Sequence, residues 1–184
     1  MLCPKDKIGE LISHRLTGGL MAHHCPDCGG NWISGKTYQS WQNEQPADLR
    51  EALPTLAEVE FEQPPLDTRA AFCPECRYYL TRTKVGQKYS FFVERCPNCS
   101  GIWCDRGEWE VLQQLGLHGC IDQFFLSDWQ MRLKELEYAQ RERQATIEKL
   151  GEDLAQQVFA LAEQLEKHPN GDFGVAYLMR RFDQ

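Results

Sequence analysis

Closely spaced cysteine pairs are the residues of this chain with the clearest chemistry. Two pairs of the form Cys-Pro-x-Cys, Cys73/Cys76 and Cys96/Cys99, stand on either side of a predicted hairpin. Two such turns bring four sulfur atoms to one point, which is the arrangement that holds Zn²⁺ in a tetrahedral site. Because four thiolates leave no open position for water or substrate, this site is predicted to be structural rather than catalytic.

The same turns also serve other chemistry. Paired Cys-x-x-Cys turns hold rubredoxin-type iron, and a single Cys-x-x-Cys pair can act as a redox dithiol. A disulfide framework fits poorly, because the chain has nine cysteines, an odd number. Zinc is therefore the favoured interpretation, and iron and redox chemistry are the alternatives.

A first copy of this frame lies near the N-terminus. It consists of Cys3, Asp6, Cys25 and Cys28, with Asp6 where a fourth cysteine would stand. A carboxylate is an acceptable zinc ligand, so we predict a second zinc site with three cysteines and one aspartate. A water in the fourth position would instead open the site to catalysis. Nearby histidines are rivals for that position: His14, His23 and His24.

The two frames belong to a duplicated module. Residues 24–32, His-Cys-Pro-Asp-Cys-Gly-Gly-Asn-Trp, align with residues 95–103, Arg-Cys-Pro-Asn-Cys-Ser-Gly-Ile-Trp. A module this small cannot bury enough apolar surface to fold alone, so zinc binding is expected to supply much of its folding energy. Trp32 and Trp103 are predicted to pack over the metal and the hairpin.

Local patterns predict the elements of the first copy. Residues 10–16 and 20–24 are predicted strands around the turn residues Thr17-Gly18-Gly19. After Trp32, Ser34 is the predicted N-cap of a short helix that runs through Trp41.

The second copy has a stronger hairpin pattern. Residues 78–85 and 89–95 are rich in Tyr, Thr, Val and Phe, with Gly86-Gln87 between them. Asp105-Arg-Gly-Glu108 then forms a predicted capping box for a helix that stops at Gly116. The remaining cysteines, Cys104 and Cys120, are predicted to be buried as small apolar side chains.

The stretch Cys96-Pro-Asn-Cys99-Ser-Gly-Ile-Trp-Cys-Asp-Arg-Gly-Glu108 resembles the TFIIB-type zinc-ribbon family of small bacterial proteins. That family's pattern begins with C-P-x-C or C-P-x-D, and Cys3-Pro-Lys-Asp6 matches the second form. The resemblance implies that Asp6 is a genuine ligand variant. The sequence departs from the family pattern in two places: Cys104 replaces the family's Leu, and the first copy lacks the Asp-x-Gly-Glu box. Most members lack an assigned activity, so the resemblance implies a fold and a metal rather than a reaction.

The segments outside the two modules differ in composition. Residues 43–70 contain four prolines and a net acidic charge, which predicts a linker with one helical turn near Leu49–Leu53. Its apolar residues leave a second reading open, an ordered strap over the ribbons. From Ser127 onward, apolar residues recur at spacings of three and four, which predicts helix. Gly151 is expected to mark a kink or an inter-helix turn.

The helical pattern has internal breaks. Gln140 and Arg143 interrupt the apolar seam, which disfavours a long coiled coil. The pattern ends at His168-Pro169-Asn170-Gly171, a strong stop, and residues 172–184 are predicted to form a further short helix. The predicted fold is α+β: two zinc-ribbon modules followed by a C-terminal α-helical hairpin or long helix. Its predicted divisions are ribbon 1 at 1–42, linker at 43–70, ribbon 2 at 71–116 and helical segment at 117–184.

Charge restricts the partners. The formal net charge of the 184 residues is −7, and two thiolate-bound zinc ions would take it to about −10. A general nucleic-acid binder needs a cationic surface, so such binding is disfavoured. The exception is the basic, aromatic hairpin at residues 77–95, which could contact single-stranded nucleic acid through cations that include Arg82, Lys84 and Lys88.

These observations predict a non-enzymatic zinc protein that acts as an adaptor or assembly factor. A protein partner is expected to bind through residues 127–184. The first alternative is a transcription-related or RNA-contacting regulator, and the second is a thiol redox protein or zinc-dependent chaperone. The N-terminus shows no signal-peptide pattern and no apolar run is long enough to cross a bilayer, so we expect a cytoplasmic protein.

Overall fold

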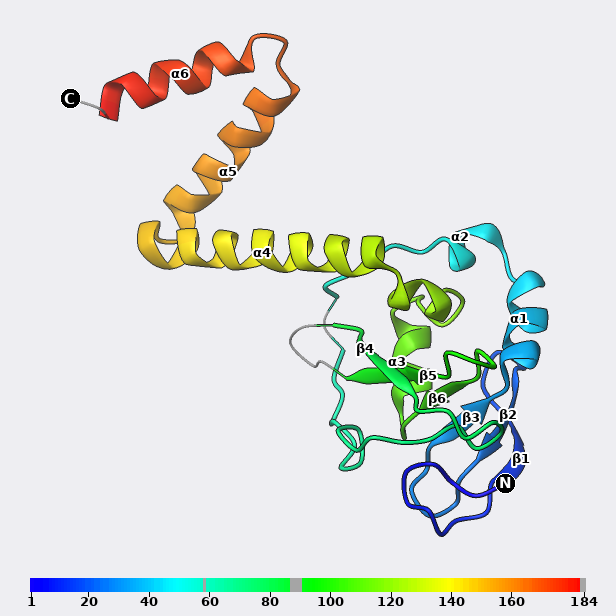
Figure 1. Cartoon of the computed structure of the whole chain (residues 1–184). Helices are drawn as coiled ribbons and strands as arrows, with labels where there is room; N and C mark the ends of the chain where they lie inside the picture. The colour runs from blue at the N-terminus through cyan, green and yellow to red at the C-terminus, as the bar shows by residue number, and fades with distance from the viewer. Residues whose placement is uncertain (58, 87–90, 183–184) are drawn as a thin grey trace. The chain divides into compact units, whose positions relative to one another are not determined.

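The computed structural model describes residues 1–57, 59–86 and 91–182. Within them the chain forms two compact units, residues 1–136 and residues 137–184. The predicted turn residue Gln87 and the first residues of the predicted strand 89–95 lie outside the described residues. The rest of the fold is α+β, as predicted, with a helical C-terminal region after the two copies of the duplicated module (Figure 1).

The first copy folds around a short hairpin. Strands β1 (Ile12–Arg15) and β2 (Met21–His24) pair antiparallel. Gly18 and Gly19 connect them with φ angles of 85° and 84°, a conformation that favours glycine. The predicted hairpin is therefore present, with strands shorter than expected.

A third strand and a helix complete this copy. Strand β3 (Asn31–Ile33) pairs with β2, and helix α1 (Gly35–Asn43) follows. The hydroxyl of Ser34 accepts a hydrogen bond from the Thr37 N–H at 3.2 Å, which confirms Ser34 as the N-cap.

The second copy repeats this order. Strands β4 (Thr81–Lys84) and β5 (Phe92–Arg95) form its hairpin, and β6 (Ile102–Cys104) pairs with β5. Helix α3 (Glu108–Gln114) follows. The predicted stop at Gly116 agrees with its positive φ of 68°.

The two copies share one sheet. Within the described residues the strand order is β1-β2-β3-β6-β5-β4, and β3 pairs antiparallel with β6. In that pairing Trp32 lies opposite Trp103, which is its counterpart in the duplicated sequence. The join therefore has approximate two-fold symmetry, and the copies pack directly on each other. Strands of three residues are too short for periodicity to reveal, so the sequence did not predict this pairing.

Glycines permit the close approach of the two copies. A Cβ on Gly30 would lie 2.1 Å from Cζ2 of Trp103, and a Cβ on Gly101 would lie 2.2 Å from Cζ2 of Trp32. Each tryptophan is fully buried. The two indoles therefore pack across the join, each on the glycine of the opposite copy, and the prediction that they pack in the core is confirmed.

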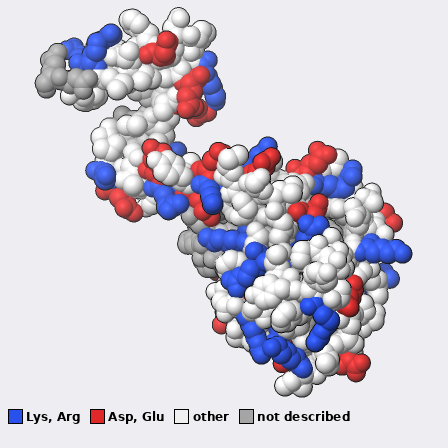
Figure 2. Space-filling view, viewed as in Figure 1, with Lys and Arg blue, Asp and Glu red and all other residues white. Residues whose placement is uncertain are grey.

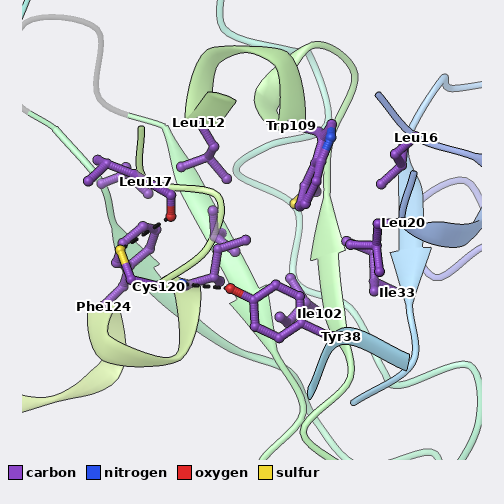
Figure 3. Close-up of a cluster of buried hydrophobic side chains, with 14 of the residues drawn as sticks. Leu16, Leu20, Ile33, Tyr38, Ile102, Trp109, Leu112, Leu117, Cys120 and Phe124 are labelled. Carbon is purple, nitrogen blue, oxygen red and sulfur yellow. Dashed lines mark hydrogen bonds between the residues drawn. The ribbon is translucent and has the colours of Figure 1, made fainter. Parts of the chain in front are cut away.

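The larger apolar core lies between the sheet and the helices that follow each copy (Figure 3). Trp41 and Trp109, one from each helix, meet edge to face with ring centroids 5.8 Å apart. Cys104 and Cys120 are completely buried in this core, as predicted. The Cys120 thiol donates to the Leu117 carbonyl at 3.3 Å, a contact drawn in Figure 3.

The segment between the copies packs on the core of the first unit, to which it belongs. It contains one short helix, α2 (Ala47–Arg50), close to the predicted helical turn. Farther along, Val59 and Phe61 pack on the core, and the Phe61 and Phe91 ring centroids are 5.1 Å apart. Asp67 is fully buried. The segment thus has the packing of a strap over the ribbons.

The first unit ends inside a long helix. After α3 comes a 3₁₀ helix, η1 (Ile121–Phe125), and then α4 (Ser127–Leu150). Near its start, Trp129 packs on Phe124 with ring centroids 4.8 Å apart. Leu133, one turn later, is 2% exposed. The beginning of α4 therefore belongs to the core of the first unit.

The described part of the second unit consists of helices and the short turns between them. Gly151, with φ of 77°, separates α4 from α5 (Glu152–Lys167) and thus forms the predicted break. The Arg143 guanidinium lies over the Phe159 ring, 3.9 Å from its centroid, and joins the two helices. Helix α6 (Gly171–Phe182) follows the predicted stop. No helix in the described part of the chain has the length and apolar character needed to span a membrane.

Candidate metal centres

Four turns with one backbone geometry carry the cysteines. In each turn the N–H that follows the second ligand position donates to the carbonyl of the first cysteine, at 2.9–3.2 Å. The donor residue has a positive φ in every case. These donors are Lys7, Gly29, Arg77 and Ser100. Three of them are not glycine, and such residues rarely adopt this conformation unless the surrounding structure enforces it.

The second site has four cysteines, Cys73, Cys76, Cys96 and Cys99, whose sulfurs all lie within 4.8 Å of one another. The Cys73–Cys99 and Cys76–Cys96 sulfur pairs are 3.5 and 3.3 Å apart. A tetrahedral shell with zinc–sulfur bonds of about 2.3 Å separates the sulfurs by about 3.8 Å. The donor set therefore fits Zn²⁺ closely.

The cysteines of this site differ: a backbone hydrogen bond favours the thiolate form of Cys76, whereas burial raises the pKa of Cys73 to about 11. The N–H of Tyr78 lowers the pKa of Cys76 to about 6, because a hydrogen bond to sulfur stabilises its negative charge. The Cys76 N–H in turn points at the Cys73 sulfur, 3.4 Å away. Zinc would be held here by four thiolates and would supply folding energy rather than a reactive water.

The first site brings Cys3, Asp6, Cys25 and Cys28 together, with ligand atoms also within 4.8 Å. The Cys3 and Cys28 sulfurs are 3.6 Å apart, and the Cys25 thiol donates to Asp6 Oδ2 at 2.9 Å. Asp6 Oδ1 accepts from two backbone N–H groups, each at 2.8 Å. One carboxylate oxygen thus fixes the turn, and the other faces the sulfurs.

The surroundings of Asp6 favour its ionised form, which is the form that binds a cation. Burial opposes its charge, but hydrogen bonds from Cys25 and from the N–H groups of Ile8 and Gly9 hold the pKa of Asp6 well below its usual range. An ionised Asp6 beside three sulfurs is a chemically reasonable zinc shell. The first site therefore fits Zn²⁺ as well, although the four-cysteine site is the cleaner one.

The rival histidines are not part of the first cluster, as far as the described residues show. His24 Nδ1 lies 3.0 Å from the Asn31 side-chain oxygen. His14 packs against the His24 ring, with centroids 5.2 Å apart. The structure therefore brings together the residues proposed from the sequence, with Asp6 in the fourth position.

Family comparison agrees with this geometry. The sequence model of the transcription factor zinc-finger family, the TFIIB-type zinc ribbon, matches residues 2–44 and 72–114. The two matched stretches stand in tandem and coincide with the two copies of the duplicated module. Comparisons with curated proteins and with solved structures gave no match. We call residues 2–44 ribbon 1 and residues 72–114 ribbon 2. Both carry the ligand set for one Zn²⁺ ion, and the ribbon family indicates a structural rather than a catalytic domain.

A third cluster of acidic side chains lies at the join of the ribbons. Asp67, Glu94 and Asp105 are buried, with carboxylate oxygens within 4.8 Å of one another. The ammonium of Lys5, which is 0% exposed, lies among them. It donates to Glu94 Oε1 and lies 3.4 Å from Asp105 Oδ2. The protein's own ammonium is therefore the cation of this cluster, and we do not assign a metal to it.

Lys5 also binds the segment between the ribbons. Its ammonium donates to the carbonyl oxygens of Leu66, Asp67 and Arg69 at 3.2, 3.3 and 2.9 Å. Lys5 belongs to the first metal-binding turn of ribbon 1, and Glu94 belongs to β5 of ribbon 2. One side chain thus ties both ribbons and the strap together, an arrangement that we call the Lys5 lock.

The Lys5 lock has a strongly perturbed electrostatic environment. Burial raises the pKa of Glu94 to about 8, although the nearby ammonium acts in the opposite direction. Burial also raises the pKa of Asp105 and, more strongly, that of Glu108. Several carboxyl groups share one buried cation, so full ionisation of all of them is unfavourable. Sequence reasoning missed Lys5, since no local pattern distinguishes a buried lysine from an exposed one.

Only one of the two hydrogen bonds of the predicted capping box, Asp105 to Glu108, is present. Glu108 Oε2 accepts from the Asp105 N–H at 2.7 Å, as expected. However, Asp105 does not cap α3: its Oδ1 accepts from the Trp103 indole at 2.9 Å, and its Oδ2 faces Lys5. Gly107 is the N-cap and makes no side-chain cap bond. The Asp105 carboxylate therefore interacts with the Lys5 ammonium and the Trp103 indole instead of capping α3.

The basic hairpin uses Arg82 for contacts within the protein. The Arg82 guanidinium lies over the Phe92 ring, 3.8 Å from its centroid, and donates to the Thr68 carbonyl at 3.0 Å. Phe91 is buried. Lys88 and Tyr89 lie outside the described residues. Lys and Arg side chains are nevertheless numerous on the face of the first unit seen in Figure 2.

Proposed function

We propose that this protein is a non-enzymatic zinc protein of the cytoplasm that serves as an adaptor or assembly factor. In this proposal the paired ribbons are a rigid base, and the C-terminal helices bind a protein partner. The observation that carries it is the contrast between closed metal shells and uncovered apolar helix faces. Each proposed metal site already has four protein ligands, whereas α5 and α6 expose large apolar side chains.

The metal-ligand assignment is part of the proposal. Zinc is bound by Cys73, Cys76, Cys96 and Cys99 in ribbon 2, and by Cys3, Asp6, Cys25 and Cys28 in ribbon 1. Support comes from the clustering of these ligand atoms and from the ribbon match that spans both sets. The cytoplasm suits this chemistry, because reducing conditions keep the thiols available to the metal.

The helical unit supports the partner-binding role. Leu154, Leu161, Met179 and Phe182 are 49%, 43%, 62% and 83% exposed. Single exposed apolar residues are ordinary, but a contiguous set on neighbouring helices is typical of an interaction surface. The beginning of α4 is excluded from this surface, since Trp129 is buried in the first unit.

A truncation at the boundary between the units tests the proposal. Tagged full-length protein and a tagged 1–136 chain would be cross-linked in cells, and the captured proteins compared. We expect the truncated chain to retain two zinc ions and to lose its specific partners. Cutting after Leu136 keeps Trp129 and Leu133 in the core, so a loss of partners would not reflect unfolding. Unchanged partners would refute the role of the helices.

A second candidate, contact with single-stranded nucleic acid, is favoured by an exposed aromatic group on ribbon 2. Phe72, Tyr78 and Tyr79 are 52%, 55% and 55% exposed, and Arg77 is beside them in the sequence. Aromatic rings next to a cation suit base stacking. A salt-sensitive mobility shift that Tyr78→Ala with Tyr79→Ala abolishes would support this function, and no shift at low salt would remove it.

A further inference from the structure

An apolar groove lies between α5 and α6 in the second unit. It has a volume of about 840 Å³, and Figure 1 shows the two helices diverging from the turn that joins them. Gly174 allows their close approach near that turn, because a Cβ there would lie 2.6 Å from Leu165 Cδ2. Away from the turn the facing apolar side chains remain uncovered. The groove is lined chiefly by Val158, Leu161, Val175, Leu178, Met179 and Phe182.

The lining follows a helix-packing pattern on both helices. On α5, Val158, Leu161 and Leu165 are three and four residues apart, and on α6, Val175, Leu178 and Phe182 have the same spacing. Stripes of this kind are the packing faces of helix bundles. The chain therefore presents two bundle-forming stripes and lacks, among its described residues, a third helix that covers them.

We propose that a second copy of this chain covers the groove, so that α5 and α6 of two copies form a four-helix bundle. This inference names the partner for the helical surface and rests on the proposed function of that surface. In the bundle, α6 of each copy lies antiparallel along α5 of the other copy. The charges at the helix ends and the exposed stripes support a second copy as the occupant.

The helix ends have complementary charge in this pairing. Helix α5 begins with Glu152 and Asp153, and α6 ends with Arg180 and Arg181. An antiparallel arrangement places the arginines of one copy beside the acidic residues of the other, and each charge also suits its own helix dipole. At the opposite end Asp172 meets the α5 terminus that carries Lys167. A parallel arrangement would instead put Asp172 beside Glu152 and Asp153.

The stripes are substantially uncovered. The six lining side chains are 36–83% exposed, with Met179 and Phe182 at 62% and 83%. A second copy seated on the groove would remove apolar surface of both copies from water. The pairing is isologous, because the same surface serves both copies.

Sedimentation velocity of the full-length, zinc-loaded protein tests the inference. We expect a dimer with twice the chain mass of 21.3 kDa at micromolar concentration. Leu161→Glu with Leu178→Glu should place charges in both stripes and shift the protein to a monomer, raising Kd at least about 100-fold. Gln157→Glu with Gln164→Glu, on the same helix but outside the groove lining, is the matched control and should remain dimeric.

A charge-exchange pair distinguishes this geometry from other contacts. Arg180→Glu with Arg181→Glu, and separately Glu152→Arg with Asp153→Arg, should each weaken self-association about tenfold or more. A mixture of the two variants should restore it as a heterodimer, since acidic α6 then meets basic α5 and the reverse. Circular dichroism would verify unchanged helix content. Failure of the mixture to associate would overturn the antiparallel pairing.

A monomeric wild-type protein at 100 μM would overturn the inference itself. That outcome would leave the proposed adaptor role intact if the cross-linked partners still depended on residues 137–184. Conversely, a dimer whose captured partners do not change on truncation would support the bundle and refute the adaptor. The two experiments can therefore refute the dimer and the adaptor role independently of each other.

Discussion

The proposed zinc site of ribbon 2 has four cysteines, whereas that of ribbon 1 has Asp6 in place of one of them. On ligand chemistry alone, ribbon 1 is the weaker copy. Its first metal-binding turn nevertheless supplies Lys5, whose ammonium holds the strap and ribbon 2 in place. The comparison shows how duplicated modules can divide their work: ribbon 2 keeps the stronger metal shell, and ribbon 1 contributes the group that joins the parts.

The metal sites should show the largest difference between the copies. Cys96→Ser is expected to leave about one zinc per chain and to destabilise the first unit by at least about 5 kcal/mol, because the metal supplies most of the folding energy of a ribbon. Asp6→Asn keeps the three cysteines of ribbon 1 and an oxygen at position 6. It should reduce zinc affinity without emptying the site. Elemental analysis after dialysis and urea titration would measure both effects.

An Asp6→Asn protein that loses more zinc than the Cys96→Ser protein would reverse the ranking of the two shells. The Cys25→Ser variant is the matched control, since Cys25 is the counterpart of Cys96 in the alignment of the copies.

The Lys5 lock should give the next largest effect. Lys5→Met removes the cation from a site with buried carboxylates and should cost about 3–5 kcal/mol of unfolding free energy. Adding Glu94→Gln should recover part of that loss, because it removes one of the unpaired acids. Lys7→Met, at an exposed position two residues away, is the control and should change stability by less than about 0.5 kcal/mol.

Urea unfolding of the full chain, followed by tryptophan fluorescence, measures these values. Equal stability of the Lys5→Met and Lys7→Met proteins would show that the ammonium does not tie the ribbons together.

Matching substitutions on the two sides of the join between the ribbons should lower stability by similar amounts. Gly30→Ala and Gly101→Ala each force a methyl group into an indole of the opposite ribbon, and each should cost about 1–3 kcal/mol through overpacking. Gly86→Ala, where no heavy atom lies within 4 Å of the added Cβ, should be nearly neutral. Thermal unfolding would compare the three variants, and a large inequality between Gly30→Ala and Gly101→Ala would break the two-fold description.

The helix starts should show the smallest difference. Ser34→Ala removes the hydroxyl that caps α1 and should cost about 1 kcal/mol. Glu108→Gln in ribbon 2 keeps an oxygen for the Asp105 N–H and removes a charge that burial disfavours, so it should cost less than about 0.5 kcal/mol. Thermal unfolding at neutral pH would separate the two. A larger loss for Glu108→Gln would show that its charge stabilises the fold.

Much of this architecture could be predicted from local patterns. The paired cysteines predicted both clusters, and Ser34, Gly116 and Gly151 predicted helix boundaries that the structure shows. These signals succeed because turn geometry, capping and thiolate chemistry depend on residues close together in the sequence.

Long-range relations could not be predicted in the same way. The pairing of β3 with β6 joins strands of three residues from different copies, and Lys5 meets Glu94 from the opposite copy. Asp105 illustrates the conflict: its local pattern indicates a helix cap, but a buried ammonium and an indole compete for the same carboxylate. Tertiary contacts decided its partner.

The position of the join has a consequence for how the protein avoids aggregation. Each ribbon uses its inner strand, β3 or β6, to pair with its own duplicate, which leaves β1 and β4 as the outer strands among the described residues. Those strands carry Arg15 on one side and Arg82 and Lys84 on the other. Cations on an outer strand oppose the addition of further strands. Duplication thus pairs the inner strand of each ribbon within one molecule. The strands left at the outer edges carry cations that oppose pairing with other molecules.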